Sequence, residues 1–235
     1  MSRGTSVVWS SVGKKFLTGI TGLLLVGFIT VHLLGNLSLY KGAAAFNSYA
    51  HFLESLAGGW VVIVFELGLL AVFLVHMAAA VTVAWLDKQA ARKEKYRVLR
   101  NAGGTSKKTL ASRSMIVTGI VVIVFVVLHV KMFKFAGEAG TFTTAHGDKI
   151  ADLYSVVVHA FKDPVIAFLY VAVMILLGLH LRHGFWSAFQ SLGWANDRWL
   201  PLLYGLALVV ALVLAVGFLL LPLYIHFNPA VVPLT

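Results

Sequence analysis

The chain has 235 residues, of which 60% are hydrophobic and only 12% are charged, and its mean hydropathy is +0.89. This balance excludes a water-soluble globular domain and predicts an integral membrane protein. The absence of cysteine excludes disulfides, covalent c-type haem attachment and cysteine-ligated iron–sulfur clusters on this chain. The net charge of +10 comes mostly from loops beside apolar segments, so it predicts topology rather than nucleic-acid binding.

Five apolar stretches are each long enough to cross a bilayer as a helix. Because a helix rises about 1.5 Å per residue, roughly 20 apolar residues cross the hydrocarbon core. We therefore predict an all-α fold, with residues 1–235 forming one transmembrane five-helix bundle. The predicted spans are residues 16–39, 60–86, 113–134, 163–188 and 199–226. We expect no cleavable signal peptide, since the first span is too long and no cleavage motif follows it. No internal repeat is evident.

The basic residues predict which way the spans run. The N-terminal segment and the second and fourth loops hold three, nine and two Lys or Arg, whereas the first and third loops hold one and four. The positive-inside rule then places the N-terminus in the cytoplasm and the C-terminus outside. Apolar residues at helical spacing over 43–57 predict an amphipathic helix on the outer surface, and 137–163 is long enough for another.

Four histidines lie one in each of the first four spans, where an ionisable side chain is costly and therefore indicates a function. Span direction converts their positions into depth, with two near the outer face and two nearer the cytoplasm. The outer two stand 17 and 16 residues after Lys15 and Arg113, so their depths match. We call His32 with His129 the outer pair and His76 with His180 the inner pair.

Two imidazoles from facing helices supply the two axial ligands of an electron-transferring haem iron. Two pairs at different depths therefore predict two non-covalent b-type haems inside the bundle, forming an electron path across the bilayer. For a single membrane histidine, an interhelical hydrogen bond or zinc ligation is an alternative. His183 lies three residues after His180 on nearly the same helix face and competes with it as ligand. The remaining four histidines fall in loops or at interfaces, where solvated or capping roles are expected: His51, His146, His159 and His226.

Several motifs in this order resemble one family, the diheme cytochrome b membrane anchors of succinate dehydrogenase and fumarate reductase, of the single-polypeptide b558 type. The motifs are GKKFLTGITGLLL and VHLLGN in the first span, GAAAFNSYAHFLESL in the first loop, and VHMAAAV, LHV and GLHLRHGFWSAFQSLG around the next three histidines. The resemblance covers nearly the whole chain. It implies that His32, His76, His129 and His180 are the four axial ligands, and it favours His180 over His183.

The resemblance also implies a function and partners. The chain would be a subunit of a succinate:quinone oxidoreductase in the bacterial cytoplasmic membrane, without a dicarboxylate active site of its own. It would carry electrons between the iron–sulfur subunit, which works with a flavoprotein subunit, and a quinone, either ubiquinone or menaquinone. Besides these partners and membrane lipid, a higher oligomer of the complex is possible. Either succinate oxidation or fumarate reduction fits.

A quinone site needs a group that exchanges protons. Glu54, in the HFLES stretch of the first loop, is the first candidate, and its alternative is a solvated helix face. Glu66 is the acid inside an apolar run, where it serves either as a proton relay or as an interhelical hydrogen-bonding group. His51 is a further proton-exchange candidate.

The haem propionates would take cationic partners at the cytoplasmic end of the bundle. The alternative role of the basic residues there is to anchor the chain to lipid headgroups. The propionate candidates are Arg182, His183, Lys15 and Arg113.

Two other functions compete with this one. The first is the diheme subunit of another quinone-linked complex, of the nitrate reductase or formate dehydrogenase type, which also uses membrane histidine pairs. The second is a transporter or a purely structural anchor without a cofactor, which predicts a colourless protein. The GAAAFNS loop segment and the pairing of spans one with three and two with four favour the succinate dehydrogenase type.

Overall fold

Five helices dominate the computed structural model, which describes residues 9–83, 110–137, 140–144 and 147–233. Within that part of the chain, these five are long and apolar enough to cross a membrane. They are α1 (Ser11–Asn36), α3 (Trp60–Val81), α5 (Leu110–Phe133), α7 (Pro164–Ser191) and α8 (Leu200–Phe227). Each predicted span overlaps one of them, although residues 84–86 lie outside the described residues. The prediction of a mainly helical integral membrane protein is confirmed.

Large apolar side chains cover the outside of the helices. Trp60, Leu67 and Val117 are 68%, 62% and 62% exposed. Water would penalise such a surface, whereas lipid tails do not. The backbone polar groups are meanwhile satisfied within each helix, which is what a bilayer requires.

Polar side chains fix two of the helix starts. The Ser10 hydroxyl accepts a hydrogen bond from the Gly13 N–H at 3.1 Å and caps α1. The Asp163 carboxylate accepts from the Val165 N–H at 2.7 Å, and Pro164 occupies the first helical position of α7. Both patterns satisfy amide groups that have no partner within a helix.

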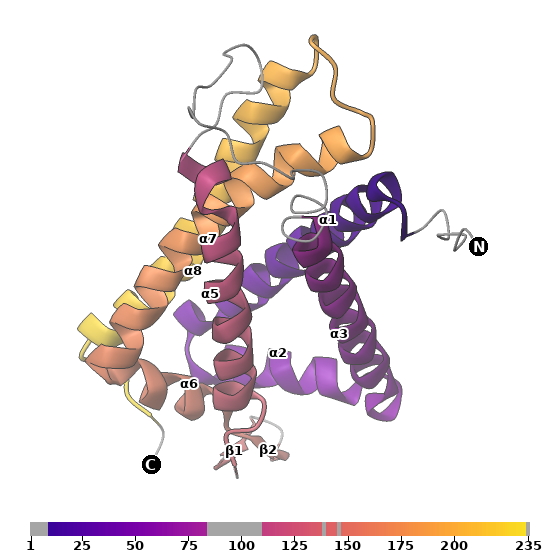
Figure 1. Ribbon diagram of the computed structural model, residues 1–235. Coiled ribbons are helices and arrows are strands. Elements are labelled where there is room, and N and C mark those ends of the chain that lie inside the picture. Colours follow the sequence, from indigo (N-terminus) through magenta and orange to yellow (C-terminus); the bar gives the residue numbers. More distant parts are fainter. Residues whose placement is uncertain (1–8, 84–109, 138–139, 145–146, 234–235) are drawn as a thin grey trace.

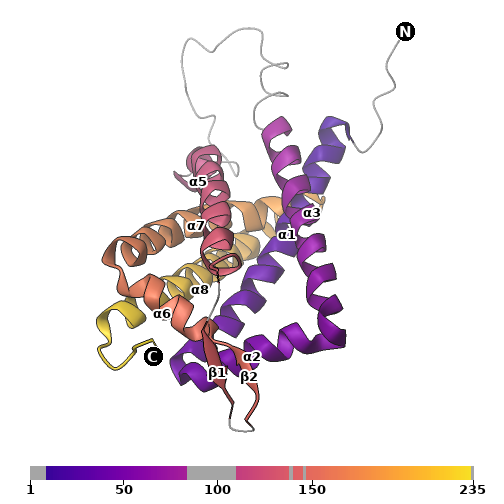
Figure 2. The same cartoon turned by 90° about the horizontal axis from the view of Figure 1, so that it is seen from below.

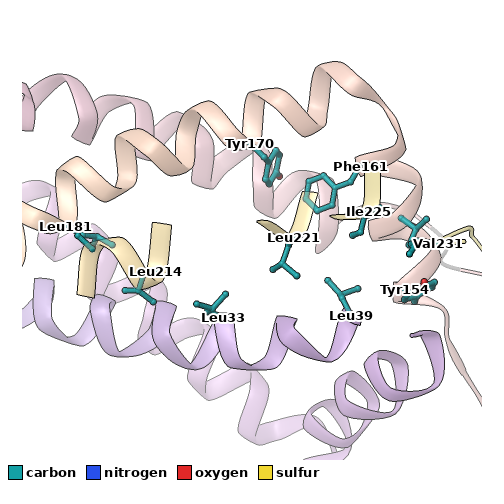
Figure 3. Close-up of a cluster of buried hydrophobic side chains, with 12 residues drawn as sticks. Leu33, Leu39, Tyr154, Phe161, Tyr170, Leu181, Leu214, Leu221, Ile225 and Val231 are labelled. Carbon is teal, nitrogen blue, oxygen red and sulfur yellow. The ribbon is translucent and has the colours of Figure 1, made fainter. Parts of the chain in front are cut away.

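Helix α7 is the centre of the bundle and packs against α8, α5 and α1, while α3 packs mainly against α1. Helices α7 and α8 lie side by side in both views, whereas α1 and α3 meet near the start of α1 and the end of α3 and diverge toward α2 (Figures 1 and 2). A buried cluster joins α1, α7 and α8 and continues to α6 (Figure 3). Its members include Leu33, Tyr170, Leu181, Leu214 and Leu221.

Short elements close the end of the bundle where α1 and α5 terminate (Figure 1). They are η2 (Leu37–Lys41), α2 (Ala43–Ser55), η3 (Leu56–Gly59), α6 (Leu153–Lys162) and the antiparallel strands β1 (Thr141–Thr143) and β2 (Lys149–Ala151). Helix α2 confirms the predicted helix in the first loop, and α6 confirms the one in the third. The hairpin departs from the all-α prediction: Phe142 pairs with Ile150, which is buried, in a stretch of strand-forming residues. We call α2, α6 and the hairpin the outer cap.

A buried polar network ties α2 to α6. The Asn47 amide group donates to Asp152 Oδ1 at 2.9 Å, and its carbonyl oxygen accepts from the Tyr154 N–H at 2.8 Å. Asp152 also caps α6, since its carboxylate accepts from the Ser155 N–H at 3.1 Å and from the Ser155 hydroxyl at 2.6 Å. Asn47 is 0% exposed and Asp152 3%. Burial, together with Tyr224 and Asp152, raises the pKa of Tyr154, so its hydroxyl stays neutral.

Candidate functional site

The structure brings the two histidines of the outer pair together near the capped end. His32 lies in the last turns of α1 and His129 in the last turns of α5. Their ring centroids are 5.9 Å apart and the rings are perpendicular. Two imidazoles on opposite sides of one metal ion have centroids about 6 Å apart when each metal–nitrogen bond is about 2 Å. The spacing therefore fits one iron between the two rings.

Aromatic side chains surround the outer pair. Phe28 and Phe125, each one helical turn before its histidine, lie with ring centroids 5.4 Å from His32 and 5.5 Å from His129. Phe218 of α8 contacts His32, and Phe133 contacts His129 at 5.1 Å. This wall is apolar and would exclude water from a bound macrocycle.

Polar contacts of the outer pair are few and unlike one another. His129 Nδ1 lies 3.3 Å from the Tyr170 hydroxyl, which also donates to the Met132 sulfur at 3.7 Å. The Asn36 amide nitrogen lies 3.5 Å from both ring nitrogens of His32 and donates to the His32 carbonyl oxygen at 2.8 Å. Because its hydrogen bond to the main chain is the shortest of these contacts, Asn36 acts mainly as a cap at the end of α1.

The inner pair lies toward the opposite end of the bundle. His76 of α3 and His180 of α7 are close enough to interact electrostatically. His76 Nδ1 is 3.1 Å from Thr21 Oγ1 of α1, and His180 Nδ1 is 3.3 Å from Thr118 Oγ1 of α5. Each inner imidazole therefore faces a hydroxyl on the neighbouring helix. A ligand histidine commonly makes such a contact through the nitrogen that does not bind the metal.

The grouping of the histidines bears on which metal centre fits. Among the described residues, no cluster of three or more His, Asp or Glu side chains could hold a metal ion. Protein zinc sites need three or four side-chain ligands, whereas a haem iron needs two axial ones. The two imidazole pairs thus fit haem better than they fit zinc.

One small pocket holds two of the predicted propionate partners. It is lined by Arg182, His183, Trp186, Tyr204 and Ala111. His183 Nδ1 is buried and has no hydrogen-bond partner within the described part of the chain, and the His183 ring lies 5.1 Å from that of Trp186. An anion such as a propionate would satisfy this nitrogen by accepting a hydrogen bond from Nδ1–H.

The other two propionate candidates are not in this pocket. Lys15 and Arg113 are exposed near the starts of α1 and α5. The neighbouring Lys14 is buried instead, at 7% exposure. The basic cluster of residues 88–108, which carries most of the topology prediction, lies outside the described residues.

The proton-exchange candidates lie near the outer cap. Glu54 and His51 are exposed on α2. The Glu66 carboxylate of α3 accepts a hydrogen bond from Lys134 Nζ at 2.6 Å, and the two side chains are 44% and 47% exposed. Glu66 therefore forms an interhelical ion pair, the alternative to a proton relay. Among the described residues, none of these three side chains forms a hydrogen bond or an ion pair with His32 or His129.

One relative of known type bears on the predicted family. The chain is 28% identical over 172 residues to the succinate dehydrogenase cytochrome b558 subunit of Bacillus subtilis (strain 168), an alignment covering 73% of this chain and 75% of the relative. The predicted family resemblance is confirmed. This chain is related to the b558-type membrane anchors. No family model and no solved structure matches it.

His180 and His183 compete as the inner axial ligand, and their surroundings differ. His180 interacts with His76 and faces Thr118, whereas His183 faces the pocket beside Trp186. Of the remaining histidines, His226 Nδ1 lies 3.3 Å from the Phe161 carbonyl oxygen, which fits the expected capping role. His159 lies in the last turn of α6, and His146 lies outside the described residues.

Sequence reasoning missed the residues that contact the four paired histidines. Thr21, Thr118 and Tyr170 were not singled out, nor was a short repeat that contradicts the expected absence of one. In α1, Thr21-Gly22 is followed by Phe28 and His32. In α5, Thr118-Gly119 is followed at the same spacing by Phe125 and His129. Comparing the spans with their histidines aligned would have revealed it.

Proposed function

We propose that this chain is the diheme cytochrome b anchor of a succinate:quinone oxidoreductase, carrying electrons between an iron–sulfur subunit and a membrane quinone. The observation that carries the proposal is the gathering of four intramembrane histidines into two pairs, one with a ring spacing of 5.9 Å. The name of the relative supports the succinate dehydrogenase type over the nitrate reductase or formate dehydrogenase type.

In this proposal His32 and His129 hold the outer b-type haem, and His76 and His180 hold the inner one. Each haem supplies a one-electron carrier when bound. The Thr21 contact puts the inner site 11 residues before His32 along α1, or about 16 Å at about 1.5 Å per residue. The apolar helices between the two sites keep water and ions away from this path.

The ends of the path follow from the proposed topology. Arg182 and His183 would bind the propionates of the inner haem in their shared pocket, on the side that faces the iron–sulfur and flavoprotein subunits. Quinone would bind near the outer haem, with Glu54 or His51 exchanging protons. Glu66 is less suited to this role because Lys134 holds it in an ion pair.

A redox-difference spectrum with haem quantitation tests the proposal. The purified complex should contain two b-type haems per copy of this chain. Absence of b-type haem would end the proposal in favour of a transporter or a cofactor-free anchor. One haem per chain would mean that one pair is wrongly assigned.

The quinone assignment has its own test. Glu54→Gln should lower succinate:quinone turnover by roughly 100-fold, the lower end of what a general acid–base group contributes. Haem content and succinate oxidation with a soluble acceptor should not change. Glu66→Gln is the matched control, and a larger loss from Glu66→Gln than from Glu54→Gln would reverse the assignment.

A further inference from the structure

Two Thr-Gly dipeptides, Thr21-Gly22 and Thr118-Gly119, contact the inner pair in the same way. Each threonine places its hydroxyl oxygen beside the Nδ1 of an imidazole on the next membrane-spanning helix, at 3.1 Å for His76 and 3.3 Å for His180. Both threonines are buried, at 6% and 1% exposure. When a buried hydroxyl lies beside a buried ring nitrogen, one of the two groups donates a hydrogen bond to the other, so the position of each proton is restricted.

The hydroxyl protons of both threonines are already committed. The Thr21 hydroxyl donates to the Leu17 carbonyl oxygen at 2.6 Å, and the Thr118 hydroxyl donates to the Ser114 carbonyl oxygen at 3.0 Å. A hydroxyl has one proton and two lone pairs. With its proton donated to the backbone in this way, each threonine oxygen is an acceptor toward the imidazole, and Nδ1 carries the proton. The Thr18 carbonyl oxygen, which also interacts with His76, is likewise only an acceptor.

This proton arrangement selects one tautomer of each inner histidine. A neutral imidazole with a proton on Nδ1 has its lone pair on Nε2. Nε2 is then the nitrogen available to a metal, and the Nδ1–H hydrogen bond fixes the plane of the ring and raises its basicity.

The glycine of each dipeptide lets the ring approach the backbone. A Cβ atom added at Gly22 would lie 3.2 Å from His76 Cε1, and one added at Gly119 would lie 3.6 Å from His180 Cε1. Other closely packed glycines meet different groups: Gly19 and Gly35 of α1 meet the Ala188 carbonyl oxygen and the Tyr49 ring, and Gly178 of α7 meets Ala215. Among the described glycines, only those of Thr21-Gly22 and Thr118-Gly119 face an imidazole in this way, whereas the glycine of Thr18-Gly19 does not.

The spacing explains why the same two helices serve both sites. Eleven residues separate Thr21 from His32 and Thr118 from His129. Eleven residues make about three turns of 3.6 residues, so the threonine and histidine of each helix lie on nearly the same face. Helices α1 and α5 each carry one outer histidine and position one inner histidine.

We propose that Thr21 and Thr118 are positioning residues for the inner haem: they hold His76 and His180 as the tautomer whose Nε2 binds iron, while Gly22 and Gly119 admit the ring edges. This inference rests on the proposed function, since it assumes a haem between the inner histidines. Threonines in membrane helices often bond only to the preceding turn, and a purely structural role of that kind is what the experiment must exclude.

The test uses Thr21→Val and Thr118→Val, which keep the shape of the side chain and remove the acceptor. Thr30→Val is the matched control, because the exposed Thr30 hydroxyl donates to the Val26 carbonyl oxygen of the same helix at 2.8 Å. Loss of a partner behind a metal ligand typically costs 10–100-fold in metal affinity. Transfer of the inner haem to excess apomyoglobin should therefore accelerate by about that factor. Its midpoint potential should rise, because a less basic imidazole stabilises the oxidised iron less.

The outer haem reports whether each variant is folded, since its content and potential should not change. Thr21→Ser and Thr118→Ser, which keep the hydroxyl, should restore the inner haem. If the wild-type chain holds two haems but both valine variants behave like Thr30→Val, the positioning role is wrong and the proposed function stands. Equal effects on both haems, or no rescue by serine, would also overturn it. A wild-type chain without haem would overturn both proposals.

Discussion

The inner and outer pairs are held in different ways. Each inner histidine meets a threonine from the neighbouring helix, and the two contacts repeat each other on α1 and α5. The outer rings instead meet each other and a wall of phenylalanines, with unlike polar partners in Tyr170 and Asn36. The inner site thus depends on four membrane-spanning helices alone, whereas the outer site also depends on α8 and on the cap.

The cap reaches the outer site through a short aromatic chain. Phe161 of α6 contacts Tyr170 at 4.9 Å and Phe133 at 5.8 Å, and both of these rings contact His129. Helix α6 is in turn held to α2 by the Asn47 network. Changes in the cap should therefore reach the outer site and leave the inner one intact, which makes the two sites separable by mutation.

Removal of a ligand imidazole should have the largest effect. His76→Ala or His180→Ala should abolish the inner haem, and His32→Ala or His129→Ala the outer one, because one axial ligand does not replace two. Each variant should retain one haem per chain, measured by a redox-difference spectrum with haem quantitation. His159→Ala, at an exposed position in the last turn of α6, is the control and should retain two. Loss of the same haem from His32→Ala and His76→Ala would contradict the pairing.

Disruption of the cap should have an intermediate effect confined to the outer site. Asn47→Ala leaves the Tyr154 N–H and the buried Asp152 carboxylate without their partner, which typically costs about 1–3 kcal/mol. The variant should unfold at a lower temperature and release its outer haem first, as followed by the absorbance of each haem during heating. The exposed neighbouring Ser48→Ala should match the wild type. Simultaneous release of both haems would show that the two sites are not separable.

Local signals in the sequence were enough to predict the spans and to single out the four histidines inside them. A long apolar run, and an ionisable residue within it, can be recognised without knowing which helices pack together. The contacts behind them depend on how helices far apart in the chain are rotated. Thr21 and His76 are 55 residues apart, and Asn47 and Asp152 are 105 apart. Glu66 shows the same limit: its apolar surroundings predicted either a relay or an interhelical contact, and they did not indicate that its ion-pair partner would be Lys134, just after α5.

The smallest effect should come from Tyr170→Phe, which keeps the ring in the aromatic wall and removes only the hydroxyl. That hydroxyl lies 3.3 Å from His129 Nδ1, and if Nε2 binds the iron, Nδ1 carries the proton and donates to the hydroxyl oxygen, as toward the threonine oxygens at the inner site. Loss of one hydrogen bond of this kind costs about 1 kcal/mol, so release of the outer haem to apomyoglobin should accelerate by roughly fivefold. Tyr40→Phe, whose ring packs on Tyr224 at the same end of the bundle, should change neither haem. A change at the inner haem in Tyr170→Phe would mean that the two sites share a support other than α1 and α5.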